Sequence, residues 1–469
     1  MTATRTERDL LGEKEVPADA YYGIQTARAL ENFRITGQVI HPALVKGLAQ
    51  VKKAAALANC QLGYLHLETA DGIAQAADEV IAGKLRDQFL VDPIQGGAGT
   101  SANMNANEVI ANRAIEILGG QKGDYLIVSP NDHVNFAQST NDVFPTAIRL
   151  AVLSRISDLG EALHRLEDAL LAKAVEFDDV VKMGRTHLQD AVPIRLGQEF
   201  HAWATAVRRG RVRIEDGARG LEEINMGATA VGTGLNADPA YPDIVIGILA
   251  SMTGRNLRRP ADLIDATQNI DGFVAVSGQV KSLAVALCKI ANDIRLMASG
   301  PRTGLKEINL PEMQPGSSIM PGKVNPVMAE VLNQTCFYVM GADLTVTLAA
   351  EAGQLELNVM EPVLAHSLLS AIDALTNAVG LFTERLVRGV TANRERCEQT
   401  VAGSVGIVTA LNPVIGYKAA SLVAREATLT GRPVREIVLE KGLLGADELD
   451  RLLSPHALTE MGIAKAHQK

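Results

Sequence analysis

The residues in this sequence that are best suited to chemistry lie on one irregular segment, GSSIMPGKVNP, at positions 316–326. Its glycines and prolines are incompatible with a regular helix or strand, so we expect a loop. The loop carries two hydroxyls, an amine, an amide and an apolar pair: Ser317, Ser318, Lys323, Asn325, Ile319 and Met320. Hydroxyl and amine donors of this kind can stabilise negative charge that develops on a carboxylate during a reaction.

Three further polar stretches share the character of this loop. They are GGAGTSANMNAN at 96–107, QSTND at 138–142 and GRTHLQD at 184–190, and we expect each at the end of a helix. Taken singly, each could be a helix cap, and His187 alone could be an ordinary structural histidine. Together with the loop they supply many neutral donors, one lysine and one imidazole. That inventory suits a small dicarboxylate whose charge must be spread in a transition state.

The same motifs exclude several other kinds of site. The loop differs from the phosphate-binding pattern GxxxxGK[ST], because five residues separate Gly316 from Gly322 and Val324 replaces the hydroxyl. Pro321 also lacks the backbone N–H that would face a phosphate. The GGAGTSA segment resembles a dinucleotide fingerprint, but no βαβ unit surrounds it. There is no HExxH, no His/Cys cluster and no GxSxG, so we predict no cofactor and no bound catalytic metal.

Composition narrows the class of protein further. The 469 residues exceed the size of one domain, and aromatic residues make up only 4%, which is low for an all-β protein. The net charge of -9 argues against a nucleic-acid partner, since phosphate binding requires a basic face.

The cellular setting is predicted from cysteines and hydropathy. Four cysteines without ligand spacing are expected to be free thiols in a reducing compartment: Cys60, Cys288, Cys336 and Cys397. The N-terminus is polar and no run of 18 apolar residues occurs, so we predict no signal peptide and no membrane partner. These features predict a cytoplasmic protein.

Long helices must position the polar stretches. Apolar residues recur at steps of three and four from Pro145 to Leu170, from Ala261 to Ala298, and from Pro326 towards Arg388. The third helix is expected to kink near Gly353 and Pro362. Helices of this length usually pack as a bundle, and a helix that is apolar all round needs more neighbours than one chain supplies. We therefore expect a helical bundle that other subunits complete.

These features together resemble the aspartase/fumarase superfamily, in which GSSIMPGKVNP is the signature loop. The match runs from about Glu7 almost to the C-terminus, and PGKVNP narrows it to aspartases and class II fumarases. Four stretches resemble the aspartase branch rather than the fumarases: DLLGEKEVPADAYYGIQT near the N-terminus, QST at 138–140, INMGATAVGTGLNADP at 224–239 and LNVMEPV at 357–363.

The resemblance implies a mainly α, three-domain fold with a long central helical bundle completed by tetramerisation. The implied domains are 1–140, an N-terminal domain; 141–394, the central bundle; and 395–469, a small helical C-terminal domain. Each active site of the homotetramer would draw on loops from three subunits. This would explain why the polar stretches lie far apart in the sequence.

The resemblance also implies the reaction, reversible deamination of L-aspartate to fumarate and ammonia by a carbon–nitrogen lyase. Ser317 would be the general base that takes the Cβ proton, and His187 the second catalytic residue. The substrate-binding residues would be Thr100, Ser139, Thr140, Asn141, Thr186, Ser318, Ile319, Met320, Lys323 and Asn325. Glu330 would orient His187.

Other functions remain open at this point. A fumarase performs the same elimination with water as leaving group, and a relative could act on substituted aspartates. An inactive structural relative would keep the bundle without the chemistry. The chain reads SPNDH at 129–133 where class II fumarases have HPND, which leaves a second dicarboxylate site in doubt. Some aspartases are activated by Mg²⁺, but no motif here predicts that.

Overall fold

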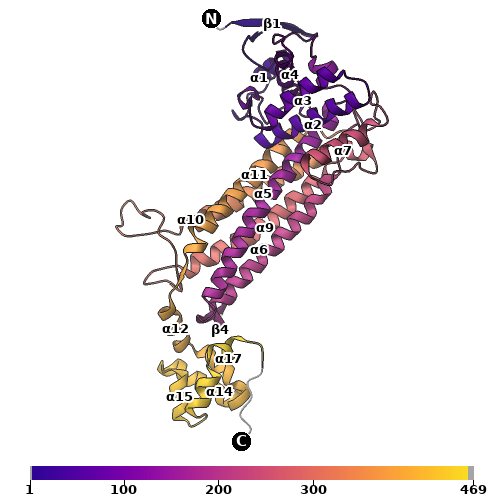
Figure 1. Ribbon diagram of the computed structural model, residues 1–469. Coiled ribbons are helices and arrows are strands. Elements are labelled where there is room, and N and C mark those ends of the chain that lie inside the picture. The colour runs from indigo at the N-terminus through magenta and orange to yellow at the C-terminus, as the bar shows by residue number, and fades with distance from the viewer. Residues whose placement is uncertain (1–2, 463–469) are drawn as a thin grey trace. The chain divides into compact units, whose positions relative to one another are not determined.

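The computed structural model describes residues 3–462 and is mainly helical, as expected (Figure 1). Chain contacts divide it into two compact units. The first holds residues up to 160 with 212–284 and 337–376, and the second holds 161–211, 285–336 and the chain from 377 onward. The division at residues 140 and 394 stays a prediction.

Five long helices contribute residues to both units: α5 (Thr140–Glu176), α6 (Leu196–Ala218), α9 (Asp271–Met297), α10 (Val327–Glu351) and α11 (Glu361–Arg385). The remaining elements of the first unit are β1 (Thr4–Asp9), β2 (Gly12–Pro17), α1 (Ile24–Asn32), α2 (Pro42–Gln61), α3 (Leu67–Ile81), α4 (Thr100–Ile117), α7 (Tyr241–Thr253) and α8 (Leu263–Gln268). Those of the second are β3 (Val181–Thr186), β4 (Gln189–Arg195), β5 (Ile308–Asn309), β6 (Thr391–Ala392), α12 (Arg394–Gly403), α13 (Asn412–Ile415), α14 (Tyr417–Thr430), α15 (Val434–Glu440), α16 (Ala446–Leu452) and α17 (Pro455–Thr459).

The strands form three separate antiparallel pairs, β1–β2, β3–β4 and β5–β6. In the second pair Thr186 lies opposite Gln189, so the connection has only two residues. This pair contains GRTHLQD, and the expectation that this stretch ends a helix is therefore wrong. A two-residue connection of type I′ has positive φ at both central positions, and His187 and Leu188 have φ of 56° and 59°.

Helix α5 begins earlier than its apolar pattern indicated. It starts at Thr140, not at Pro145, and ends at Glu176. A proline inside a helix lacks the N–H that would donate to the carbonyl four residues earlier, here that of Asn141. The side chain of the fully buried Asn225 donates to this carbonyl at 3.1 Å instead. A residue distant in sequence thus permits the helix to extend past its proline.

Two other expected helices are each divided in two. The segment expected from Ala261 to Ala298 breaks at Asn269, whose backbone is extended and whose side chain donates to Asp265, as asparagine often does outside helices. The segment after Pro326 does not kink but ends at Glu351 and restarts at Glu361. In the second break the Asn358 side chain donates to the carbonyls of Ala349 and Ala350, in the last turn of α10, where helix carbonyls lack helical donors.

The smaller helices form local cores within their units. In the first unit α3 packs against both α2 and α4, and α7 against α2 (Figure 1). In the second unit the C-terminal helices surround a buried apolar cluster that includes Leu411, Val423, Ile437 and Leu449. All four cysteines are free thiols; Cys60 is half-buried and the other three are buried.

Two helical segments are long and apolar enough to cross a membrane by length and composition, α9 and Glu361–Gly389. Half of each most apolar window is nevertheless buried inside the fold. A core helix in a bundle has the same length and composition, so this feature is weak evidence for a membrane segment.

Candidate functional site

The predicted catalytic loop is irregular backbone between β5 and α10, as its glycines and prolines indicated. Within it the Ser317 Oγ accepts two backbone hydrogen bonds, from the N–H of Ile319 at 3.2 Å and from the N–H of Met320 at 2.9 Å. Ser317 is half-buried, whereas Ile319 is 83% exposed. Two N–H dipoles aimed at one hydroxyl oxygen favour negative charge on that oxygen.

The loop is closed at its base by a close backbone contact. The N–H of Gly316 donates to the Lys323 carbonyl at 2.7 Å, and the Asn325 side chain donates to the Gly316 carbonyl at 2.7 Å. A Cβ on residue 316 would lie 2.6 Å from the Lys323 carbonyl oxygen and 2.8 Å from the Asn325 nitrogen. Only glycine fits this closure. Lys323 and Ser318 are exposed on the closed loop.

Thr186 and His187 lie at the exposed tip of the β3–β4 hairpin. A non-glycine residue with positive φ is uncommon, and such strain often marks functional positions. Glu330 lies in the first turn of α10. Among residues 3–462 no hydrogen bond joins Glu330 to His187, so their pairing stays a prediction.

A buried ion cluster fixes the base of this hairpin. Glu307, which is fully buried, lies 2.7 Å from Arg185 Nη1 and 3.1 Å from Lys182 Nζ. The same lysine amine lies 2.9 Å from Glu199 at the start of α6. Buried charges of opposite sign at these distances hold one arrangement strongly, because separating them leaves a charge without a partner. The cluster therefore links the strand that carries Thr186 to the chain ten residues before Ser317.

In the first unit, Thr100 begins helix α4 directly after a constrained glycine. Gly99 has φ of 91°, and a Cβ there would come within 2.5 Å of the Phe144 ring on α5. The missing side chain lets the start of α4 approach the start of α5. The Thr100 hydroxyl is exposed and donates to the Gly97 carbonyl at 2.7 Å.

Ser139 caps helix α5, which is the role that the QSTND stretch taken singly could have. Its Oγ accepts from the N–H of Asn141 at 3.2 Å, and its own N–H donates to Asp142 Oδ1 at 3.0 Å. The other oxygen of Asp142 accepts from the N–H groups of Gly227 and Thr229 at 3.1 and 3.0 Å. This buried carboxylate thus ties the QST stretch to the INMGATA stretch.

A buried polar network lies behind the QST stretch. The amine of Lys52, 0% exposed, donates to Asn135 Oδ1 at 2.8 Å and to Gln138 Oε1 at 2.9 Å. Asn103 donates to Asn135 and to the Thr140 hydroxyl, both at 3.2 Å. Burial lowers the pKa of Lys52 to about 7, against the opposing effect of Asp142. Burial also raises the pKa of Asp142 to about 7.

The predicted residues therefore fall into two groups, one in each unit. The first-unit group has Thr100 together with the consecutive Ser139, Thr140 and Asn141, joined through Asn103. The second-unit group lies on the closed loop, the hairpin tip and the start of α10, and comprises Thr186, His187, Ser317, Ser318, Ile319, Met320, Lys323, Asn325 and Glu330.

Sequence reasoning missed the residues that support these groups. Nothing in the sequence distinguishes Lys52 from the neighbouring Lys53, which forms an ordinary ion pair with Asp78. Asn103 and Asn107 lie in the polar stretch at 96–107, but no role was predicted for either, and the structure shows that both are buried. No three His, Cys, Asp or Glu side chains lie together as a possible metal site in the part of the chain that the structure describes.

Comparison with known proteins identifies relatives along nearly the whole chain. Residues 12–341 match the family model described as Lyase, and residues 407–460 match the one described as Fumarase C C-terminus. The chain is 58% identical to an aspartate ammonia-lyase from a Bacillus species over 463 residues, 99% of each chain. It is 52% identical to the aspartate ammonia-lyase of Escherichia coli strain K12, covering 96% of this chain and 95% of the relative.

Solved structures with the same fold are also found. A fumarate lyase:delta crystallin from Brucella melitensis bound to cobalt superposes with a TM-score of 0.94 and 51% identity, over 97% of this chain and 99% of that one. A recombinant class II fumarase from Schistosoma mansoni superposes with a TM-score of 0.92 and 36% identity, over 97% of this chain and 98% of that one.

Proposed function

This chain belongs to the lyase family whose model it matches over residues 12–341, and from that membership we propose that it is an aspartate ammonia-lyase. The enzyme would eliminate ammonia from L-aspartate to give fumarate, reversibly. The observation that carries the proposal is the 58% identity to an aspartate ammonia-lyase over 99% of both chains, against 36% to a class II fumarase.

Ser317 acts as the general base in this proposal. Its alkoxide takes the Cβ proton of aspartate, and the electron pair moves into the β-carboxylate to form an enediolate. The enediolate then expels the amine as the Cα–N bond breaks. A serine hydroxyl is a weak base, but the N–H groups of Ile319 and Met320 on its Oγ favour the charged form.

Hydroxyls would hold the β-carboxylate and its enediolate: those of Thr100, Ser139, Thr140 and Ser318. The Thr140 oxygen accepts from Asn103, which leaves its own hydrogen free to donate to substrate. The Thr100 hydrogen instead donates to Gly97 and would rotate to reach a ligand. Prearranged donors of this kind are worth about 3 kcal/mol each in stabilising a developing oxyanion.

The remaining residues bind the other end of the substrate. Lys323 would contact the α-carboxylate as a point charge and Asn325 through its second amide hydrogen, since the first closes the loop. The ammonium group would meet Asn141, whose Nδ2 already donates to the Ala230 carbonyl and whose oxygen therefore faces away from that bond. Thr186 and His187 complete this end, with Glu330 orienting the imidazole. Ile319 and Met320 form the apolar lid over the substrate.

We also propose a homotetramer in which each active site takes loops from three subunits. The apolar stripe of α10 supports this. Phe337, Leu344 and Leu348 lie on one face at helical spacing and are 60%, 61% and 57% exposed in the single chain. Large apolar side chains in a continuous stripe usually mark a protein interface. The location proposed for this assembly is the cytoplasm, where the four thiols stay reduced.

The test follows fumarate by ultraviolet absorbance with L-aspartate in one cuvette and L-malate in another. We expect fumarate from aspartate alone, with an equal amount of ammonia. Ser317→Ala should reduce kcat by at least about 1,000-fold, because it removes the base itself. Ser421→Ala, which removes an exposed hydroxyl from α14, is the matched control and should retain full activity.

Each other outcome selects a different function. Fumarate from malate alone would identify a fumarase, and silence with both substrates would direct the assay to substituted aspartates. No product from substituted aspartates either would favour the hypothesis of an inactive structural relative. Full activity in the Ser317→Ala enzyme would reject Ser317 as the base while leaving the reaction intact.

A further inference from the structure

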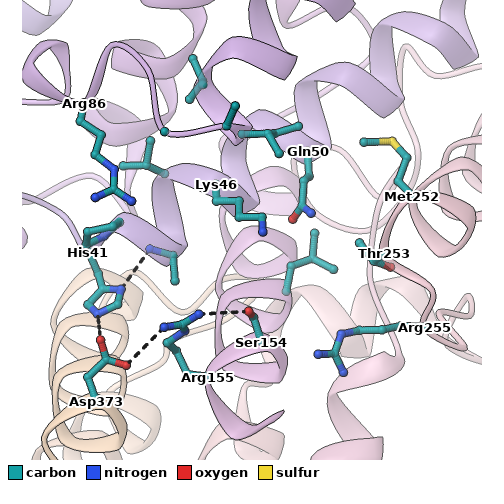
Figure 2. Close-up of a pocket in the computed structure, with 18 residues that line it drawn as sticks. His41, Lys46, Gln50, Arg86, Ser154, Arg155, Met252, Thr253, Arg255 and Asp373 are labelled. Carbon is teal, nitrogen blue, oxygen red and sulfur yellow. Dashed lines mark hydrogen bonds and ion pairs between the residues drawn. The ribbon is translucent and has the colours of Figure 1, made fainter. Parts of the chain in front are cut away.

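A cavity of about 540 Å³ in the first unit collects positive charge that the proposed reaction does not use (Figure 2). It is bordered by the start of α2, the end of α3, the middle of α5, the end of α7 and one turn of α11. Six titratable side chains line it: His41, Lys46, Arg86, Arg155, Arg255 and Asp373. The volume lies in the range of cavities that hold small ligands, and none of the predicted site residues lines it.

The one carboxylate in the lining is already engaged. Asp373 is hydrogen-bonded to His41 Nε2 at 3.0 Å and lies 3.9 Å from Arg155 Nη1 (Figure 2). Arg155 has a second partner in Asp158, 2.7 Å from its Nη2. Both carboxylates are therefore engaged by His41 or Arg155 rather than by the other cations of the cavity.

The other three cations have no such carboxylate partner in the part of the chain that the structure describes. Arg255 donates to the Leu153 carbonyl at 2.8 Å and to the Ser157 hydroxyl at 3.0 Å, both neutral acceptors. Burial lowers the pKa of Arg255, against the opposing effect of Glu222, as for a cation partly removed from water. Within residues 3–462 no ion pair joins Lys46, Arg86 or Arg255 to a carboxylate. Figure 2 shows Lys46 near the centre of the cavity with Arg86 and Arg255 on either side.

The helix ends around the cavity add to the positive potential. The first turn of α2 carries no acidic residue, and its N-terminus is positive by virtue of the helix dipole. The N–H groups of this turn already have acceptors: the His41 Nδ1 accepts from Ala43, and the His41 carbonyl accepts from Leu44 and Val45. The C-terminal end of α3 also borders the cavity and carries the negative end of a helix dipole. Its last carbonyls already accept backbone N–H groups, so they reduce the positive potential less.

We propose that this cavity binds a small polyanion through a diphosphate or triphosphate group, with Lys46, Arg86 and Arg255 as its counter-charges. Guanidinium forks match phosphate oxygens in geometry, and a lysine adds a point charge. The neutral polar groups of Gln50 and Thr253 also line the cavity and can donate to the remaining oxygens. Three cations without ion-pair partners lie in one cavity although the chain is net negative, so the cavity should prefer a multiply charged anion.

The test measures binding of inorganic pyrophosphate and of ATP to the assembled enzyme by titration calorimetry, without divalent metal. The double variant Lys46→Ala/Arg86→Ala removes two exposed cations that make no other described contact. Its aspartate turnover should therefore be unchanged, and unchanged turnover shows that the variant folds. Lys418→Ala/Arg425→Ala removes the same two charges from the exposed face of α14 and serves as the control. We expect the cavity variant to bind pyrophosphate at least about tenfold more weakly and the control within twofold of the original protein.

The two phosphate probes separate the possible ligands. Equal affinity for ATP and pyrophosphate means that the phosphates alone are recognised, and tighter ATP binding means that a nucleotide fits; both support the proposal. No binding by the unmodified enzyme would overturn it. The proposal would also be overturned if Lys323→Ala abolished pyrophosphate binding while Lys46→Ala/Arg86→Ala did not change it, because the anion would then bind at the loop that carries Lys323. Equally tight binding of citrate would reject phosphate recognition.

Discussion

At the scale of single residues, the chemistry proposed for the loop at 316–326 depends on small distances between ordinary groups. Two backbone N–H groups donate to the Ser317 oxygen, and they favour negative charge on it. Those groups are held in place by the closure of the loop at Gly316, where the chain passes too close for any side chain. The geometry of the proposed base thus depends on a residue that has no functional group.

Gly316→Ala tests this dependence. The added methyl must displace the Lys323 carbonyl, so the Ser317 oxygen should shift and kcat should fall about 100-fold, as expected for a misplaced catalytic group. Because the loop is largely exposed, the thermal midpoint should change by no more than about 2 °C. Steady-state kinetics and circular dichroism measure the two effects.

Gly403→Ala is the control, since a Cβ there meets nothing within 4 Å and the backbone is not left-handed. It should leave kcat unchanged. An active Gly316→Ala enzyme would mean that the loop reaches its working geometry without the closed base.

At the scale of elements, the helix end that carries Thr140 and Asn141 is completed by a residue from elsewhere in the chain. Pro145 leaves the Asn141 carbonyl without its helical donor, and Asn225 supplies one. Asn141 and its neighbours Ser139 and Thr140 are predicted substrate contacts, so this bond stabilises the helix turn that presents them.

Asn225→Ala should therefore lower the free energy of unfolding by about 1–3 kcal/mol, the cost of leaving a buried carbonyl unpaired. Pro145→Ala would restore the missing backbone N–H. In that background Asn225→Ala should be markedly less destabilising, and denaturant unfolding of the two single variants and the double variant measures the difference. Equal effects in both backgrounds would show that Asn225 acts through its other bond, to Thr267.

A second element depends on a buried carboxylate whose ionisation gives a pH-dependent stability. Asp92 accepts hydrogen bonds from the N–H groups of Ile35, Thr36, Gly37 and Ile94 and from the Thr36 hydroxyl. Burial raises the pKa of Asp92, but these donors outweigh it and leave the pKa below its ordinary value of 3.8. The carboxylate form is therefore stabilised in the folded chain.

A carboxyl with a depressed folded-state pKa contributes stability above its unfolded value and loses it as the pH falls through the folded value. Asp92→Asn should thus lower stability by about 2 kcal/mol at pH 7. The difference from the original protein should begin to shrink as the pH falls below about 4, where the unfolded Asp92 becomes protonated. It should be smallest once the pH is also below the lowered pKa of the folded Asp92. Thermal unfolding at the two pH values measures it, and a difference independent of pH would assign the effect to shape rather than charge.

At the scale of the whole molecule, the single chain leaves apolar surface that a subunit interface would bury. The α10 stripe of Phe337, Leu344 and Leu348 is such a surface, with each side chain more than half exposed. Subunit packing would also bring loops of different chains together. Assembly and activity should therefore be lost together.

Leu344→Asp places a charge in the proposed interface and should convert the tetramer to smaller species with little residual activity. Leu429→Asp, at a leucine that is 75% exposed on α14 and lies outside the α10 stripe, should change neither property. Light scattering coupled to size-exclusion chromatography gives the mass of each. A Leu344→Asp protein that stays tetrameric and active would remove α10 from the interface.

The sequence by itself determined the chemical inventory and the main helices. The glycines and prolines of 316–326 required a loop, and the spacing of apolar residues predicted the long helices, because both effects act within a few residues. The hydroxyls, the lysine and the amides also pointed to a dicarboxylate without reference to any neighbour.

Only the tertiary structure decided where elements begin, end and turn. The hairpin tip at His187 and Leu188 lacks the Asn-Gly signal, so no local rule predicted its two positive φ values. The start of α5 and the break after α10 depend on Asn225 and Asn358, whose bonds reach backbone that each residue meets only after folding. The burial of Lys52 and the grouping of cations in one cavity have the same cause. The environment of each side chain is set by residues distant in sequence, and local spacing along the chain does not predict such contacts.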